Sequence, residues 1–222
     1  MLIDPMAPAD KPETAQMVVI HRALRRELAL LPDLIAAVRP GDTARATLLG
    51  RHLALVLHML HDHHEAEDEL LWPILEHRAP LADDLVTTMI TQHQVVESTI
   101  ETITRDLPKW TARADDPAPL AATLRRLREA LDEHLDAEER SVLPLIHEHL
   151  TVAEWKAPQA YAMANGPKAL TDKLLQAGLV LEEANPRETA WFLAEMPPPA
   201  RLLWRALGRR LYARRVAAVR RA

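Results

Sequence analysis

Hydrophobic residues recur at three- and four-residue steps along most of this chain, which is the spacing of one face of an α-helix. The steps predict four long helices, at residues 13–38, 43–77, 81–112 and 120–149. Turn-forming residues such as Pro40-Gly41 separate them, and Pro32 is expected to kink or interrupt the first helix. Four amphipathic helices joined by short loops favour an all-α fold, an up-down-up-down four-helix bundle with a helical C-terminal extension.

The pattern changes after residue 150, where breaks at residues 165–167, 185–186 and 197–199 divide the chain into short segments. We therefore expect a flexible N-terminus at 1–12, the bundle at 13–150 and a helical extension at 151–222. The extension ends in a basic amphipathic segment, with eight arginines after Pro199 and no acid after Glu195. Such a helix can lie on an anionic membrane surface, but we expect Trp204 and the leucines of residues 199–222 to pack on the bundle.

The amino-acid composition excludes several classes of protein and site. Hydrophobic residues make up 48% of the chain and aromatic residues only 4%, so the core must be largely aliphatic. A net charge of −5 gives no reason to expect a nucleic-acid partner. The absence of cysteine excludes disulfides, thiolate zinc sites and cysteine-ligated iron–sulfur clusters. No signal peptide or membrane-spanning stretch is recognisable, so the sequence predicts a soluble, cytoplasmic protein.

The chemistry lies in a repeat of the motif His-x-x-x-Glu, each copy followed by a proline ten residues after its histidine. The copies are offset by 71 positions and consist of His63, Glu67 and Pro73, and of His134, Glu138 and Pro144. A further histidine precedes each copy, at His21 and at His93. The chain therefore consists of two helix pairs, each of which supplies one histidine and then one His-x-x-x-Glu.

This spacing suits a metal centre. Residues four apart lie on the same face of a helix, and the inward faces of a bundle converge on one axis. Imidazole and carboxylate both bind iron, and a glutamate can bridge two ions, so a dinuclear site is chemically reasonable. His61 and His64 do not match the second copy and are expected beside the site or exposed. The remaining histidines are expected to be solvated: His52, His58, His77, His147 and His149.

The order of these motifs resembles the bacterial haemerythrin-like family, also called the HHE cation-binding domain, over residues 13–150. The resemblance implies two non-haem iron ions with an oxo or hydroxo bridge, which react with or sense oxygen, peroxide or nitric oxide. It also implies six metal ligands, which are His21, His63, Glu67, His93, His134 and Glu138. The spacing of the ferritin-like carboxylate proteins, Glu-x-x-His, and that of the zinc proteases, His-Glu-x-x-His, are both absent.

One position departs from the oxygen-carrying members of the family. They have a second histidine one turn after the third-helix ligand, where this chain has Glu97. Glu97 is therefore a candidate seventh ligand, the alternative being a polar residue beside the site. Additional anionic ligands stabilise ferric iron, so we expect peroxide removal or other redox chemistry, such as a catalase-like activity. The alternatives are a module that binds oxygen reversibly or stores iron, and a gas or iron sensor that signals through the extension.

Overall fold

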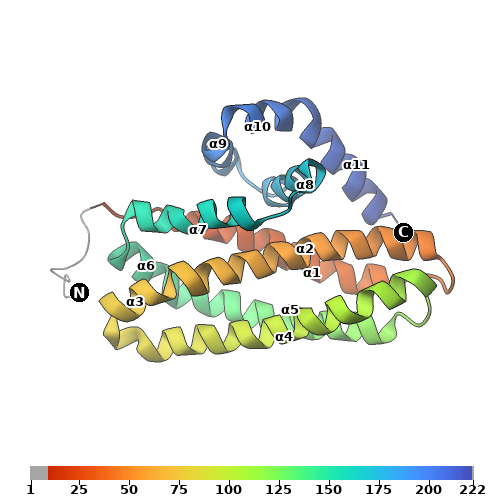
Figure 1. The fold of residues 1–222 in the computed structure, drawn as a ribbon, viewed down its shortest axis with the longest axis horizontal. Coiled ribbons are helices and arrows are strands. Elements are labelled where there is room, and N and C mark those ends of the chain that lie inside the picture. The colour runs from red at the N-terminus through yellow and green to blue at the C-terminus, as the bar shows by residue number, and fades with distance from the viewer. Residues whose placement is uncertain (1–9, 222) are drawn as a thin grey trace.

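A computed structural model describes residues 10–221, and every regular element in this range is a helix. The all-α prediction is confirmed, while most of the predicted flexible terminus at 1–12 lies outside the described residues. Four long helices run side by side along the longest axis (Figure 1): α1 (Ala15–Ala36), α2 (Thr43–Leu70), α4 (Asp83–Arg113) and α5 (Ala118–Ala137). Residues 37–42 and 114–117 connect them at one end, and α3 (Trp72–Arg78) with a 3-10 turn (Pro80–Ala82) connects them at the other.

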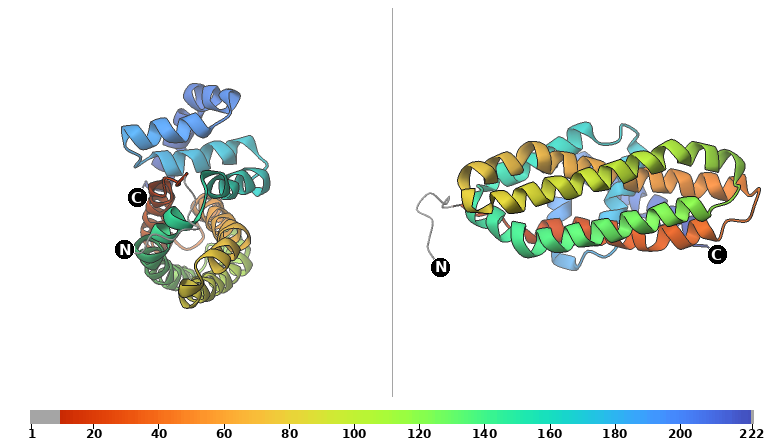
Figure 2. Two further views of the ribbon diagram at one scale, coloured as in Figure 1. Left: turned by 90° about the vertical axis from the view of Figure 1, so that its left-hand side faces the viewer. Right: turned by 90° about the horizontal axis from the view of Figure 1, so that it is seen from below.

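The four long helices surround a common axis, as the view along it shows (Figure 2), and their buried apolar side chains pack together. They form two separate clusters rather than one. The larger cluster includes Leu28, Val56, Ile100 and Leu127 in the main length of the bundle. The smaller cluster lies toward the α3 end and includes Met17, Trp72, Met89 and Ile146. Five of the residues singled out above fall, along their helices, between the residues of the two clusters: His21, His63, Glu67, His93 and Glu138. His134 lies next to Leu135, the last residue of the larger cluster in α5.

Two prolines, Pro73 and Pro144, lie where the helices next to the motif are irregular. Of the two outcomes expected at Pro32, a kink or an interruption, the interruption is wrong, because α1 continues through it to Ala36. In contrast, α2 ends just before Pro73, and a π-helical turn, η2 (Glu138–Val142), precedes Pro144 in α6 (Leu143–His149). Proline lacks an N–H and its ring presses on the carbonyl four residues earlier, so the regular helical hydrogen bonding is disturbed in both repeats at or within four residues of the motif glutamate.

The extension folds against the α1–α2 side of the bundle (Figures 1 and 2). It contains α7 (Val152–Asn165), α8 (Leu170–Leu181), α9 (Pro186–Glu195), α10 (Pro198–Leu203), the π-helical turn η3 (Trp204–Gly208) and α11 (Arg209–Val219). Trp204, Tyr212 and Val219 are buried, while Leu202 and Leu207 remain exposed. Part of the apolar face of this segment is therefore covered, and Tyr212 lies against Gly178 of α8. Among the described residues, no helix has the length and apolar character needed to cross a bilayer.

A buried ionic network joins the extension to the bundle. Glu27 in α1 is only 1% exposed and lies 2.9 Å from His52 Nε2 and 3.1 Å from Arg220 Nη2. The expectation that His52 is solvated is wrong, because its ring is buried against this carboxylate. Arg220 also pairs with Glu182 of the segment that follows α8. Charged groups from four parts of the chain thus meet in one place.

Candidate metal centre

The six ligands predicted from the repeat lie together in the interior. All are buried, and they come from α1, α2, α4 and the end of α5 with η2. Their side chains form a polar layer between the two apolar clusters: His21, His63, Glu67, His93, His134 and Glu138. The amphipathic register of each helix therefore places one or two candidate ligands at the same depth of the bundle.

The four histidines are arranged as two equivalent pairs. His21 Nε2 lies 3.2 Å from His63 Nε2, and His93 Nε2 lies 3.1 Å from His134 Nε2. Two imidazole nitrogens that bind one ion at about 2.1 Å, at right angles, are separated by about 3 Å. Each pair therefore has the nitrogen spacing that two ligands of one metal ion require.

The two glutamates connect the pairs. Glu67 places Oε1 3.4 Å from His63 Nδ1 and Oε2 3.5 Å from His93 Nε2. Glu138 Oε2 lies 3.3 Å from His21 Nε2 and 3.8 Å from His134 Nε2. Each carboxylate thus touches one histidine of each pair, which is the position that a bridging ligand between two ions would occupy.

Hydrogen bonds from outside the layer fix the orientation of the rings. His93 Nδ1–H donates to Asp68 Oδ1 at 2.7 Å, and His21 Nδ1–H donates to Glu139 Oε1 at 2.9 Å. His134 Nδ1–H likewise donates to Gln92 Oε1 at 3.2 Å. A hydrogen bond at Nδ1 leaves the lone pair on Nε2, so three imidazoles present a ligand atom to the interior.

Sequence reasoning missed the two acids in this orienting role. Asp68 and Glu139 occupy equivalent positions, each directly after the motif glutamate, and this 71-residue match was the signal that could have found them. Each acid is held in turn, since Trp72 Nε1 donates to Asp68 at 2.8 Å and the Arg25 guanidinium donates to Glu139. The second repeat thus reproduces the function of the first with different supporting groups.

The protonation of these groups suits metal binding. Burial, followed by the neighbouring histidines, lowers the pKa of His63 and brings the pKa of His134 to about 2. Both rings are therefore neutral, which is the form that binds metal. Burial also raises the pKa of Glu67 and of Glu138, and for Glu67 the nearby Glu138 adds to the effect. A cation between these carboxylates would remove the penalty for ionising them.

The buried oxygens provide a direct test of whether a metal fits. Both oxygens of Glu67 and both oxygens of Glu138 are buried and have no hydrogen-bond partner among the described residues. A buried polar atom without a partner costs about 1–3 kcal/mol, so four of them in one layer require an explanation. Metal coordination supplies the partners that the protein itself does not. The residues present therefore fit a metal centre.

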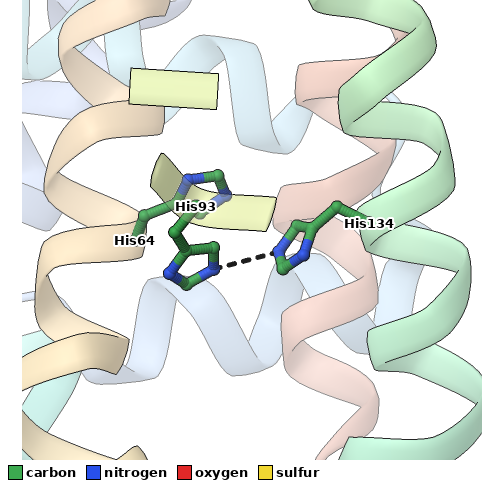
Figure 3. Close-up of side chains that lie close together, drawn as sticks. All are labelled: His64, His93 and His134. Atoms are coloured by element: carbon green, nitrogen blue, oxygen red, sulfur yellow. Dashed lines mark hydrogen bonds between the residues drawn. The ribbon is translucent and has the colours of Figure 1, made fainter. Parts of the chain in front are cut away.

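His64 and Glu97 lie at different depths of the bundle. His64 is buried and its ring stacks on the ring of His93, with centroids 4.0 Å apart and planes 8° from parallel (Figure 3). His64 therefore lies in the buried polar layer. The Glu97 carboxylate accepts a hydrogen bond from His61 Nδ1 at 3.0 Å, and these side chains are 38% and 42% exposed. Glu97 thus lies at the surface of the bundle, on the side where His61, Asp62 and Glu65 gather, and is no part of the buried layer.

The ligand atoms separate into two groups whose members lie within 4.8 Å of one another. One group contains His21, His63, Glu67 and Glu138, and the other contains His64, His93 and His134. Comparison with protein families matched residues 13–146 to the Hemerythrin HHE cation binding domain. Comparisons with curated proteins and with solved structures gave no match. The matched segment extends from the residues before α1 into α6 and includes both groups.

Proposed function

We propose that the buried layer of this chain, which belongs to the haemerythrin HHE cation-binding family, holds two iron ions and reacts with oxygen or peroxide. The observation that carries the proposal is the position of Glu67 and Glu138, whose unpartnered oxygens lie between two pairs of histidines. The connections of the four long helices alternate between the two ends of the bundle, so the proposal includes the up-down-up-down order.

In this proposal His21 and His63 would hold one ion, His93 and His134 would hold the other, and Glu67 and Glu138 would supply carboxylate ligands to both. Bound iron would supply one-electron redox chemistry toward oxygen species. The surrounding residues keep the imidazoles neutral and orient them through Asp68, Gln92 and Glu139. The apolar clusters above and below the layer limit the access of water, which strengthens the binding of the carboxylates to cations.

The position of Glu97 bears on whether the proposed iron centre turns over peroxide or binds oxygen reversibly. The preference for peroxide removal rested on the loss of the third-helix histidine, whose place Glu97 takes, and on a ligand set richer in carboxylates. Its carboxylate lies beside His61 at the surface, and the buried layer instead contains a fifth imidazole, that of His64. A ligand set rich in neutral imidazole stabilises ferrous iron better than one rich in carboxylates. Reversible oxygen binding without turnover is therefore the second candidate.

Metal analysis tests the proposal. Protein purified from iron-replete cells is expected to contain about two irons per chain and to absorb in the near-ultraviolet and visible range as ferric carboxylate–imidazole centres do. Glu67→Ala and Glu138→Ala should lower the iron content, and the matched control Glu97→Ala should not. About one iron or less in the unaltered protein would refute the dinuclear centre.

Gas exchange separates the two candidate uses. Anaerobically reduced, iron-loaded protein would be exposed to oxygen, returned to an inert atmosphere, and followed by absorption. Recovery of the reduced spectrum over repeated cycles would favour reversible binding. Steady consumption of hydrogen peroxide, lost in Glu67→Ala and kept in Glu97→Ala, would favour turnover.

A further inference from the structure

We infer that His61, Asp62 and Glu65 of α2 form a second metal site, outside the buried layer, and that this site binds one zinc ion. The inference goes beyond the proposed iron centre and does not depend on it, because the two sites share no ligand. The side chains involved also contact groups of α4 and of α7, two helices that pack against α2 (Figure 1). Glu97 supports the second site without being one of its ligands.

The first evidence is the spacing of the ligand atoms. One ring nitrogen of His61 and one carboxylate oxygen each of Asp62 and Glu65 lie within 4.8 Å of one another. His61 and Glu65 are one turn apart on the same face of α2, so both can reach one ion. Two ligands of a tetrahedral zinc ion are separated by about 3.4 Å. The His61 side chain is 42% exposed and therefore has room for the small rotation that closes the set.

The second evidence is the burial of Asp62. Its side chain is only 9% exposed and accepts no hydrogen bond from any of the described residues. A Cβ added to Gly166, at the end of α7, would lie 3.7 Å from Asp62 Oδ2, so the extension covers this carboxylate. Its one ion-pair partner is His58 Nε2 at 3.4 Å, on a side chain that is 41% exposed. A buried carboxylate with so few partners is costly, and a cation supplies the partner that it lacks.

The third evidence is the hydrogen bond between His61 and Glu97. His61 Nδ1–H donates to Glu97 Oε2 at 3.0 Å, across the contact between α2 and α4. A hydrogen bond at Nδ1 leaves the lone pair on Nε2, and carboxylates commonly orient metal-binding imidazoles in this way. Asp68 orients His93 of the buried layer by the same arrangement. Glu97 therefore has a role at the surface that its distance from the buried layer does not deny it.

The charge around the site favours a divalent cation. Within the part of the chain that the structure describes, no lysine or arginine forms an ion pair with Asp62, Glu65 or Glu97. The charge of Lys168 acts on Asp62, but its ammonium group donates to the carbonyl of Ala164 at 2.9 Å. Calcium and magnesium prefer ligand sets made of oxygen alone. An imidazole with carboxylates suits zinc, with a water molecule as the fourth ligand.

Zinc titration of the iron-loaded protein, with free zinc set by a chelator, tests the inference. The unaltered protein should bind one zinc ion with micromolar affinity or better. His61→Gln and Glu65→Gln each remove a ligand and should weaken zinc binding about a hundredfold, whereas Glu97→Gln only releases the ring and should weaken it about tenfold. The matched control is Glu101→Gln, one turn after Glu97 on the exposed side of α4, which should bind zinc as the unaltered protein does.

X-ray absorption at the zinc edge locates the ion. Zinc at this site should have one imidazole among oxygen ligands, whereas zinc in the buried layer would be surrounded by two or more imidazoles. One imidazole, lost in His61→Gln, is expected whether or not the buried layer holds iron. Two or more imidazoles, an affinity that is equal in all four variants, or millimolar binding typical of an adventitious ion only would overturn the second site. The iron content of the same samples reports separately on the proposed dinuclear centre.

Discussion

Replacing Glu27 by Gln should destabilise the protein in a pH-dependent way. The Glu27 carboxylate is buried in α1 and lies against His52, Arg26 and Arg220. Burial alone would raise its pKa, but the hydrogen bonds and positive charges of His52 and Arg26 outweigh burial and lower the pKa to about 2. Glutamine keeps the size and one hydrogen-bonding oxygen but removes the negative charge that faces Arg26 and Arg220.

The lowered pKa sets the size of the effect. A carboxyl group whose pKa falls from 4.5 to about 2 on folding contributes about 3 kcal/mol to the free energy of unfolding. Because the pKa is lowered, this contribution is complete above pH 4.5 and disappears as the pH falls toward 2. At pH 3 about 1.5 kcal/mol of it should remain. Removal of one partner from a buried ion pair costs about 3–5 kcal/mol of stability, which agrees with the roughly 3 kcal/mol expected here.

Urea denaturation, monitored by circular dichroism, would measure the loss of unfolding free energy in Glu27→Gln at pH 7 and at pH 3. The matched control is Asp33→Asn in the same helix, where the carboxylate is 82% exposed and pairs with Arg125 at 2.9 Å. An exposed pair should contribute about 0.5 kcal/mol or less. Equal losses for the two variants at pH 7, or a loss in Glu27→Gln that does not shrink at pH 3, would refute the electrostatic reasoning.

Three further predictions concern the centre and the extension. Asp68→Ala should weaken iron binding about tenfold or more by releasing His93; an unchanged affinity in chelator competition would contradict this. Gly178→Ala would place its Cβ 2.3 Å from the Tyr212 ring, so the free energy of unfolding should fall by about 1–3 kcal/mol and trypsin should cleave α11 faster. Removal of residues 199–222 should leave co-sedimentation with anionic vesicles unchanged, because part of the apolar face is already buried; binding that depends on this segment would favour the membrane alternative.

Periodicity predicted the fold well but missed its irregularities. The four helices appear within a few residues of the predicted ranges, apart from the breaks before Pro73 and Pro144. Pro32 and Pro73 look alike in the sequence, yet only the helix near Pro73 ends there. Whether a helix continues through a proline depends on tertiary contacts on both sides, which a local pattern does not contain.

The site was predictable to the extent that it is symmetric. Six candidate ligands follow from two matching copies of one motif and the histidine before each, and the structure brings all six together. The burial of His64 beside them was not predicted, because its equivalent in the second copy is Leu135. Glu97 was chosen from the family pattern, but its carboxylate lies at the surface beside His61. The direction of a side chain depends on the rotation of its helix about the helix axis. Neither the comparison of the two copies nor the family pattern determines that rotation.

The polar layer has a consequence for how cooperatively the bundle unfolds. It separates a small apolar cluster, containing Trp72 and Ile146, from the larger one, so few apolar contacts connect the two ends. The prolines that follow the ligands disturb the helix ladders at the same depth. Without metal, the small end should open as a separate unit, with faster amide exchange than the rest of the bundle. Bound ions would tie all four helices across this plane, so that loss of metal would appear first as a loss of cooperativity.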